Sequence, residues 1–176
     1  GEIRWVWDRG YGVAGDDGEP GAIEGFIQDV TPRKRNEQAL IEAEQRFRDL
    51  FDNVAEGIFQ TTAEGRYLRA NPSLARIYGF ESPAALTAHF NLVRDGLYVD
   101  PGVRERFVSA LERDHQVRDF ESRVRRRDGA IIWISENARA VRDGNGRLLY
   151  YEGTVEDITE RKAYEAQIAH HAQHDP

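Results

Sequence analysis

The sequence contains no cysteine, which excludes disulfide bonds, thiolate-bound zinc and thiol nucleophiles. It has no apolar run long enough to cross a bilayer and no recognisable signal peptide. Basic residues are outnumbered by acidic ones, because 24 Lys and Arg residues against 31 Asp and Glu residues give a net charge of −7. This balance disfavours nonspecific attraction to nucleic acid or anionic lipid. We therefore expect neither a nucleic-acid partner nor a membrane-spanning segment within this chain.

The patterns typical of enzymes are missing as well. No spacing places a nucleophile beside an oriented base, a phosphate-binding glycine loop, or paired carboxylates in a pocket. We therefore expect this segment not to be an enzyme. With 176 residues, the chain can form one domain of ordinary size with a hydrophobic core, together with one further fragment.

What the sequence does contain is an internal repeat. Residues 1–34 match residues 129–162 without a gap, at an offset of 128 positions. The shared residues include Trp5 and Trp133, Gly25 and Gly153, Asp29 and Asp157, Thr31 and Thr159, and Lys34 and Lys162. A repeat at the spacing of an ordinary domain suggests tandem copies of one structural unit. We therefore expect one whole unit, preceded by the closing hairpin of another.

Each copy is expected to form a hairpin followed by a helix. In the second copy, apolar residues fall on even positions from 132 to 140, interrupted by Glu136, which indicates a strand with one buried face. The turn at Asp143–Gly146 contains residues that tolerate positive φ. Thr159, like Thr31, can cap the next helix with its hydroxyl. Because two strands alone are marginal in water, the first hairpin should pair with another sheet edge or remain partly disordered.

A carboxylate and a guanidinium recur where each hairpin meets its helix. Asp157 lies four residues before Arg161, as Asp29 lies four before Arg33. This spacing allows an ion pair across the strand-to-helix corner, although a solvated surface pair is the alternative. Recurrence in both copies favours a role for the corner. We predict a signal junction at Asp157, Thr159 and Arg161.

Two helices are expected to flank the complete unit. The first runs from Pro32 to about Val54, and the second from Glu160 to Asp175. In the first helix, apolar residues recur at steps of three and four, namely Leu40, Ala43, Phe47 and Leu50. This spacing favours a coiled-coil seam, with packing on the domain's own sheet as the alternative. We therefore expect a homodimer formed through the linker helices.

Between these helices the pattern predicts an α+β domain. Strands are expected at residues 57–62, 66–70 and 118–127, ahead of the closing hairpin. Asn71 and Ser82 each stand before a proline and can cap a short helix, and Gly79 can end the first of these. A longer helix is expected over residues 103–113. The result is a five-stranded antiparallel sheet with helices on one face.

The repeated segment resembles the closing strands of PAS domains, often called the PAC motif, through Gly-x-x-x-Trp, a glycine-rich turn and the residues 157–162, Asp-Ile-Thr-Glu-Arg-Lys. Upstream, residues 47–51, 55–59 and 71–80 resemble the first helix, first strand and first core helix of that fold. The resemblance implies a sensory domain. It divides the chain into a hairpin from a preceding PAS domain (1–31), a linker (32–43), a PAS domain (44–160) and an exit helix (161–176).

The last residues, His174-Asp-Pro176, resemble the start of a GGDEF diguanylate cyclase domain. This implies a covalently attached effector in a longer bacterial protein, with a cyclase that makes cyclic di-GMP as the first choice and a histidine kinase as the second. The absence of cysteine is compatible with the cytoplasm, where we expect this segment, while its parent protein can be attached to a membrane. The alternative function is a ligand-free, dimerising structural spacer.

PAS-like domains bind ligands between the sheet and the inserted helices, or relay strain from neighbouring domains. The predicted cavity residues are Phe59, Ile77, Phe80, His89, Phe90, Leu97, Tyr98, Phe107, Leu111, Phe120 and Ile134. Plain core packing is the stronger explanation for the apolar members of this set.

The cofactor, if there is one, is not identified by the sequence. Haem is weakly supported, since His89 and His115 are single histidines near the region that supplies an axial ligand in haem-binding relatives. Photochemical flavin is excluded, because those relatives share an Asn-Cys-Arg-Phe motif and this chain has no cysteine. His170 and His174 have a zinc-chelating spacing, but a hydrophilic linker is favoured and no metal is expected. The arginines at 123 and 125–127 are expected on the exposed side of a strand and its turn, and not in a nucleic-acid site.

Overall fold

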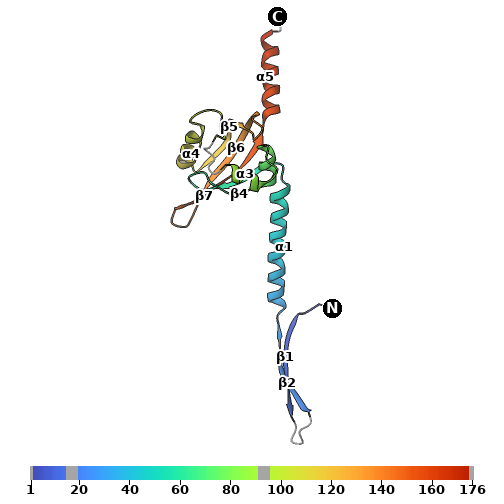
Figure 1. Ribbon diagram of the computed structural model, residues 1–176. Coiled ribbons are helices and arrows are strands. Elements are labelled where there is room, and N and C mark those ends of the chain that lie inside the picture. Colours follow the sequence, from blue (N-terminus) through green and yellow to red (C-terminus); the bar gives the residue numbers. More distant parts are fainter. Residues whose placement is uncertain (1, 15–19, 91–95, 175–176) are drawn as a thin grey trace. The chain divides into compact units, whose positions relative to one another are not determined.

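The computed structural model describes residues 2–14, 20–90 and 96–174. The chain divides into two compact units, residues 1–49 and 50–176 (Figure 1). Helix α1 (Thr31–Asn53) begins in the first unit and ends in the second. Its bounds agree with the predicted helix within one residue.

The first unit contains an antiparallel pair of strands, β1 (Val6–Ala14) and β2 (Pro20–Asp29). Apolar side chains on this hairpin are exposed, with Trp5, Trp7 and Phe26 showing 59%, 47% and 52% of their surface. The rings of Trp7 and Phe26 meet edge to face at 5.1 Å. The hairpin therefore forms without burying its aromatic residues.

The second unit confirms the predicted α+β class. Its strands are β3 (Gly57–Thr61), β4 (Tyr67–Ala70), β5 (Gln116–Arg125), β6 (Ile131–Arg142) and β7 (Leu148–Asp157). They form an antiparallel sheet in the order β4-β3-β7-β6-β5. The closing hairpin β6–β7 thus lies inside the sheet, with β5 on one side and β3 on the other.

Among the residues that the structure describes between β4 and β5, three helices are found, namely α2 (Pro72–Ile77), α3 (Pro83–His89) and α4 (Val103–Asp114). The predicted caps are confirmed, because Asn71 Oδ1 accepts from the Leu74 amide at 2.9 Å and Ser82 Oγ from the Ala85 amide at 3.1 Å. Gly79 has φ of +79° just after α2, as predicted. A final helix, α5 (Thr159–His174), follows β7 directly.

The core lies between the sheet and the inserted helices. Fully or almost fully buried side chains include Leu74, Leu86, Leu97, Phe107, Leu111, Val124, Ile134 and Val155. Asn71 ties this core to the end of α1, since its Nδ2 donates to the carbonyls of Phe51 and Glu56. Its Oδ1 also accepts from the Ile58 amide at 2.8 Å, so one side chain joins α1, β3 and α2.

Strand β5 departs from the prediction at its start. It begins at Gln116, two residues before the expected Arg118, and its register with β6 shifts between Val117 and Phe120. Asp119 has φ of +50° within this irregularity. A left-handed Asp in a bulge has no marker in the alternating pattern, which explains the error.

Candidate functional site

The strand-to-helix corner is held by backbone and side-chain hydrogen bonds from β6. The Trp133 amide donates to Thr159 Oγ1 at 3.0 Å, and the Ile158 amide donates to the Trp133 carbonyl at 2.9 Å. The Thr159 amide in turn donates to Asp157 Oδ1 at 2.9 Å. The predicted helix cap is therefore wrong in detail, because the Thr159 hydroxyl accepts from the sheet while the Asp157 carboxylate accepts the first helical amide.

The predicted pair between Asp157 and Arg161 does not form either. Arg161 donates to Glu121 Oε1 at 3.1 Å, and Lys162 Nζ lies 2.5 Å from Glu121 Oε2. These contacts lower the pKa of the Glu121 carboxyl, with the Lys162 hydrogen bond as the largest cause. Lys162 Nζ also lies 5.6 Å from the centre of the Trp133 ring. The helix is therefore tied to both β5 and β6.

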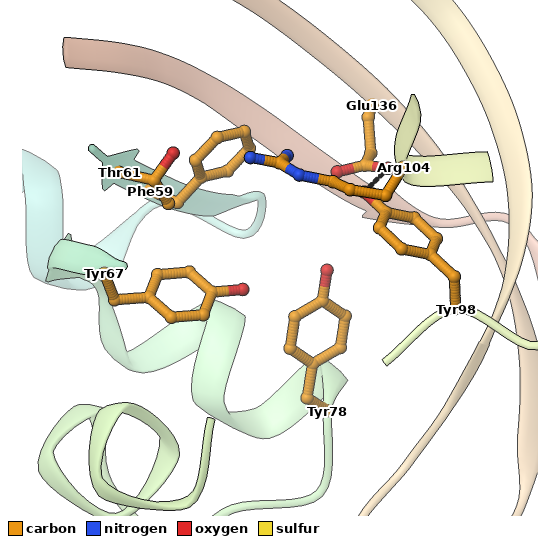
Figure 2. Close-up of a pocket in the computed structure, with 7 residues that line it drawn as sticks. All are labelled: Phe59, Thr61, Tyr67, Tyr78, Tyr98, Arg104 and Glu136. Carbon is orange, nitrogen blue, oxygen red and sulfur yellow. Dashed lines mark hydrogen bonds between the residues drawn. The ribbon is translucent and has the colours of Figure 1, made fainter. Parts of the chain in front are cut away.

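A small cavity lies inside the second unit, between the sheet and the helices (Figure 2). Its lining residues come from several elements, namely Phe59, Thr61, Tyr67, Tyr78, Tyr98, Arg104 and Glu136. About 10 Å³ is open to the centre of a water molecule, which is roughly the space that one water needs. The lining is polar for a core cavity, with three phenols, a hydroxyl, a guanidinium and a carboxyl.

Glu136 is the most unusual member of this lining. It occupies an inward position of β6 and is only 3% exposed, and the Tyr98 hydroxyl donates to its Oε2 at 2.9 Å. Burial raises the pKa of Glu136 to about 7, although the Tyr98 hydrogen bond and the Arg104 charge act in the opposite direction. Glu136 can therefore change its charge near neutral pH.

The tyrosines around Glu136 keep their protons. Burial raises the pKa of the Tyr67, Tyr78 and Tyr98 phenols, and the charge of Glu136 adds to this effect. Figure 2 shows the hydroxyls of Tyr67 and Tyr78 directed into the same space beneath the Arg104 guanidinium. These phenols can therefore act as hydrogen-bond donors toward the cavity.

Two lining groups are buried without a hydrogen-bond partner among the residues that the structure describes. They are the hydroxyl of Thr61, a residue that is 1% exposed, and Nη2 of Arg104. The Arg104 guanidinium lies 5.7 Å from the centre of the Phe107 ring. Because a buried donor without a partner costs about 1–3 kcal/mol, both groups favour a bound acceptor.

The predicted cavity residues divide into three groups. Phe59 and Tyr98 line the cavity. Others belong to the surrounding core, namely Phe80, Phe90, Leu97, Phe107, Leu111 and Ile134, with Ile77 and Phe120 partly buried against it. His89 is exposed at the end of α3, with its ring centre 4.9 Å from that of Phe90. His89 is therefore not placed to ligate a group inside the core.

Five lining residues were not predicted, namely Thr61, Tyr67, Tyr78, Arg104 and Glu136. Glu136 carried a usable signal, because it interrupts the apolar face of a strand. A carboxylate at an inward position is costly unless it has a partner or a function. Arg104 carried no such signal, since an arginine in the first turn of a helix is ordinary.

The other features considered in the sequence give no site. His115 is exposed at the end of α4, and the side chains of His170 and His174 lie outside the described part. Within that part, no group of three or more His, Asp or Glu side chains is arranged to hold a metal. Over the same residues, no helix has the length and apolar character required to cross a bilayer.

The sheet, the inserted helices and the polar cavity between them define an α+β domain of sensory type. The family model described as "PAS fold" matches residues 45–158, and the chain belongs to this family. A crystal structure of a PAS domain from Colwellia psychrerythraea is 26% identical, with a TM-score of 0.56 over 67% of this chain and 98% of that one.

The curated relatives are longer than this chain. Sporulation kinase C of Bacillus subtilis (strain 168) is 25% identical over 139 residues, which cover 79% of this chain and 32% of that protein. A probable diguanylate cyclase of Escherichia coli (strain K12) is 28% identical over 128 residues, which cover 72% of this chain and 11% of that protein. The chain thus spans about a third or less of these relatives.

Proposed function

We propose that this chain is a sensory relay, in which occupancy of the cavity changes the corner at Asp157, Thr159 and Arg161 and thereby moves α5. The observation that carries this proposal is that strand β6 contributes residues to both the cavity and the corner. Glu136 of β6 lines the cavity, and Trp133, three residues earlier on the same strand, binds Thr159 and Ile158 through its backbone.

The relay needs only a small displacement of β6. A ligand that changes the charge or the contacts of Glu136 weakens the bond between its Oε2 and the Tyr98 hydroxyl, so the carboxyl and its strand can shift. Because the Trp133 amide and carbonyl fix the first turn of α5, the shift changes the geometry of the helix start. A ligand that binds one of two corner arrangements more tightly then shifts the population between them.

The effector downstream is proposed to be a diguanylate cyclase, with a histidine kinase as the alternative. Support for the cyclase comes from the terminal residues 174–176 and the diguanylate cyclase relative, and support for the kinase from Sporulation kinase C. Both kinds of effector use nucleoside triphosphates of the cytoplasm, so we propose that compartment for the relay, with cyclic di-GMP as the output in the cyclase case.

The proposed organisation follows the repeat. Residues 1–31 would close a preceding PAS domain, 32–43 would form a linker, 44–160 the sensory domain and 161–176 the exit helix. A homodimer through the linker helices is proposed from the apolar series in α1, in which Leu40 and Leu50 are 61% and 68% exposed. An exposed leucine series at this spacing is typical of a helix that packs against a second copy.

The test of the relay is Asp157→Ala, which removes the acceptor of the Thr159 amide. In the full-length protein, ligand affinity should stay unchanged, while the response of the effector to ligand should be lost. In the present chain, a ligand should alter hydrogen exchange in the first turn of α5 in the wild type and not in the variant. If affinity and coupling fell together, the corner would be part of the binding site and the relay proposal would be wrong.

A ligand-free, dimerising spacer is the second candidate, and the small size of the cavity favours it. Native mass spectrometry of the purified chain, compared with its denatured mass, separates the two functions. A dimer that carries extra mass supports a sensor. A dimer of bare chains, unchanged after incubation with candidate ligands, supports the spacer.

A further inference from the structure

We infer that the cavity binds a small monovalent anion, such as formate, acetate or chloride, between Arg104 and the hydroxyls of Thr61, Tyr67 and Tyr78. The inference rests on the proposed sensory function and names the chemical class of its ligand. Each of these four residues lines the cavity, and they come from α4, β3, β4 and the end of α2.

The cavity contains two buried donors that lack an acceptor among the described residues. A guanidinium can only donate, and Nη2 of Arg104 lacks a partner within the described residues. The Thr61 hydroxyl is likewise unpartnered and almost fully buried. The Tyr67 and Tyr78 hydroxyls point into the same space (Figure 2). A ligand that only accepts hydrogen bonds satisfies all four groups, and small anions are ligands of that kind.

The charge of the site depends on Glu136. The groups that face it are the phenols of Tyr67, Tyr78 and Tyr98, which stay neutral, and the Arg104 guanidinium, which is always charged. With Glu136 protonated, the site carries one positive charge and matches a monovalent anion. With Glu136 ionised, its carboxylate neutralises Arg104 and repels the anion. Binding is therefore linked to uptake of one proton by Glu136.

The size of the cavity restricts the ligand further. Space for about one water molecule admits a halide or a one-carbon carboxylate with little rearrangement. A two-carbon carboxylate requires the Arg104 side chain to move, which its rotatable bonds allow. Dicarboxylates and aromatic acids are too large for this space. Chloride and small carboxylates share the same recognition chemistry, and separate titrations distinguish them.

The test is an NMR titration of the complete 176-residue chain with sodium formate, acetate and chloride at pH 6 and pH 8. Acetamide, a neutral molecule of the same shape as acetate, is the control ligand. At least one anion should bind saturably at pH 6 and about tenfold more weakly at pH 8, as the proton linkage at Glu136 requires. Acetamide should not bind. Equal binding of acetamide and acetate, or no saturable binding of any anion, would overturn the inference.

Three variants identify the groups involved. Arg104→Gln should abolish anion binding, whereas Arg106→Gln, on the exposed side of the same helix, should leave it unchanged. Glu136→Gln should bind the anion equally at pH 6 and pH 8. Thr61→Val provides a milder test if Arg104→Gln does not fold, with a severalfold loss of affinity expected. Unchanged affinity in the folded Arg104 or Thr61 variant would contradict the assignment.

The proposed ligand class and the proposed relay can be contradicted independently of each other. An anion that binds with the expected pH dependence but leaves hydrogen exchange at the start of α5 unchanged supports the ligand class and contradicts the relay. If no anion binds, the ligand class is wrong, while another ligand that changes exchange at α5 would still support the relay.

Discussion

The two hairpins of this protein have the same backbone plan in very different surroundings. In β1–β2, Val6 faces Asp29 and Gly10 faces Gly25, and in β6–β7 the residues 128 positions later, Ile134 with Asp157 and Ala138 with Gly153, face each other in the same way. Each hairpin also has one register shift, after Val13 and after Val141. The repeat in the sequence is thus a repeat of strand register as well.

The corners that follow the hairpins are also alike. The Trp5 amide donates to Thr31 Oγ1 at 2.8 Å, and the Thr31 amide donates to Asp29 Oδ1 at 2.9 Å. The corresponding bonds at the second corner, from Trp133 and Thr159, measure 3.0 Å and 2.9 Å. Because the first corner forms on a two-stranded sheet, a hairpin followed by the Asp-x-Thr sequence is sufficient to set its geometry.

The difference between the hairpins is burial. Glu136 is enclosed by β3, β4 and the inserted helices, whereas its counterpart Asp8 is exposed on β1. The corner is therefore a local structure, while the cavity is a product of the whole domain. The proposed relay between them therefore requires a hairpin that belongs to a complete sheet, and this distinction can be tested with matched substitutions at equivalent positions.

The largest effect is expected for the paired glycines. A Cβ on Gly153 would lie 2.2 Å from the Asn137 carbonyl oxygen and 2.9 Å from the Phe59 ring. Strand and core must both move, so Gly153→Ala should lower the free energy of unfolding of the second unit by about 4 kcal/mol. Urea unfolding of the second unit, monitored through the hydrogen exchange of buried amides such as that of Val155, measures this change.

Gly25→Ala is the matched control. Its Cβ would lie 2.4 Å from the Arg9 carbonyl oxygen, so β1 and β2 must separate, but both strands are exposed. The stability of the second unit should not change. If Gly25→Ala lowered the stability of the second unit as much as Gly153→Ala does, the two hairpins would be energetically coupled and could not be compared as independent structures.

The next effect is the pH dependence that Glu136 confers. Its pKa is about 7 in the folded domain against an ordinary 4.5, so between these values the folded state holds a proton that the unfolded state has lost. The free energy of unfolding should therefore fall as pH rises from about 4.5 to 7, by about 3 kcal/mol in total. Denaturation at a series of pH values should show this fall in the wild type and not in Glu136→Gln.

Asp8→Asn alters the equivalent position of the exposed hairpin. The substitution should leave the pH dependence of the second unit as it is in the wild type. The prediction for Glu136 fails if the Glu136→Gln variant keeps the wild-type slope between pH 5 and pH 7.

The contrast between corner and cavity also explains what the sequence could predict. The sheet, the helix caps at Asn71 and Ser82 and the repeat were predictable, because alternation, capping and turn residues act over a few positions. The strand-to-helix corner was predicted to contain a capping Thr159 and an Asp157–Arg161 pair, and both side-chain interactions were wrong. Thr159 bonds to Trp133, which is 26 positions away, and helix propensities contain no information about such a contact.

The cavity was largely unpredictable for the same reason. Tyr67, Tyr78 and Arg104 are separated along the chain and meet only after the helices have packed on the sheet. Each is an ordinary residue in its local segment. Glu136 was the exception, since a strand pattern alone identifies a carboxylate that faces inward.

A smaller effect is expected at the corner itself. Thr159→Val removes the acceptor of the Trp133 amide and should destabilise the start of α5 by about 1 kcal/mol, with faster hydrogen exchange at Trp133 and in the first turn of the helix. Thr31→Val should do the same to the Trp5 amide and the start of α1, because the bonds are equivalent. If only one of the two variants had this effect, the corners would not be equivalent in energy.

The smallest effect concerns Glu121, an ion-pair partner that only a complete sheet supplies to the corner. Lys34 and Lys162 each pair with a glutamate three residues later, Glu37 or Glu165, but Lys162 also pairs with Glu121 of β5. Glu121→Gln should destabilise the start of α5 by less than about 1 kcal/mol, because the pair is partly exposed. The loss should appear in hydrogen exchange at low ionic strength and disappear at about 1 M salt.

Glu165→Gln and Glu37→Gln are the matched controls for that variant. Each removes a glutamate within its own helix. Glu37 pairs with Arg33 as well as Lys34, whereas Glu165 pairs with Lys162, so Glu37→Gln should weaken α1 slightly more than Glu165→Gln weakens α5. Neither variant should loosen the bond between helix and sheet. If only Glu121→Gln gave a salt-dependent increase in hydrogen exchange at the start of α5, strand β5 would stabilise the exit helix directly through this ion pair. Strand β5 also pairs with residues 134–136 of β6, which include the cavity residue Glu136. The ion pair between Glu121 and Lys162 would therefore connect the second corner to the core, and the described part of the first hairpin lacks such a connection.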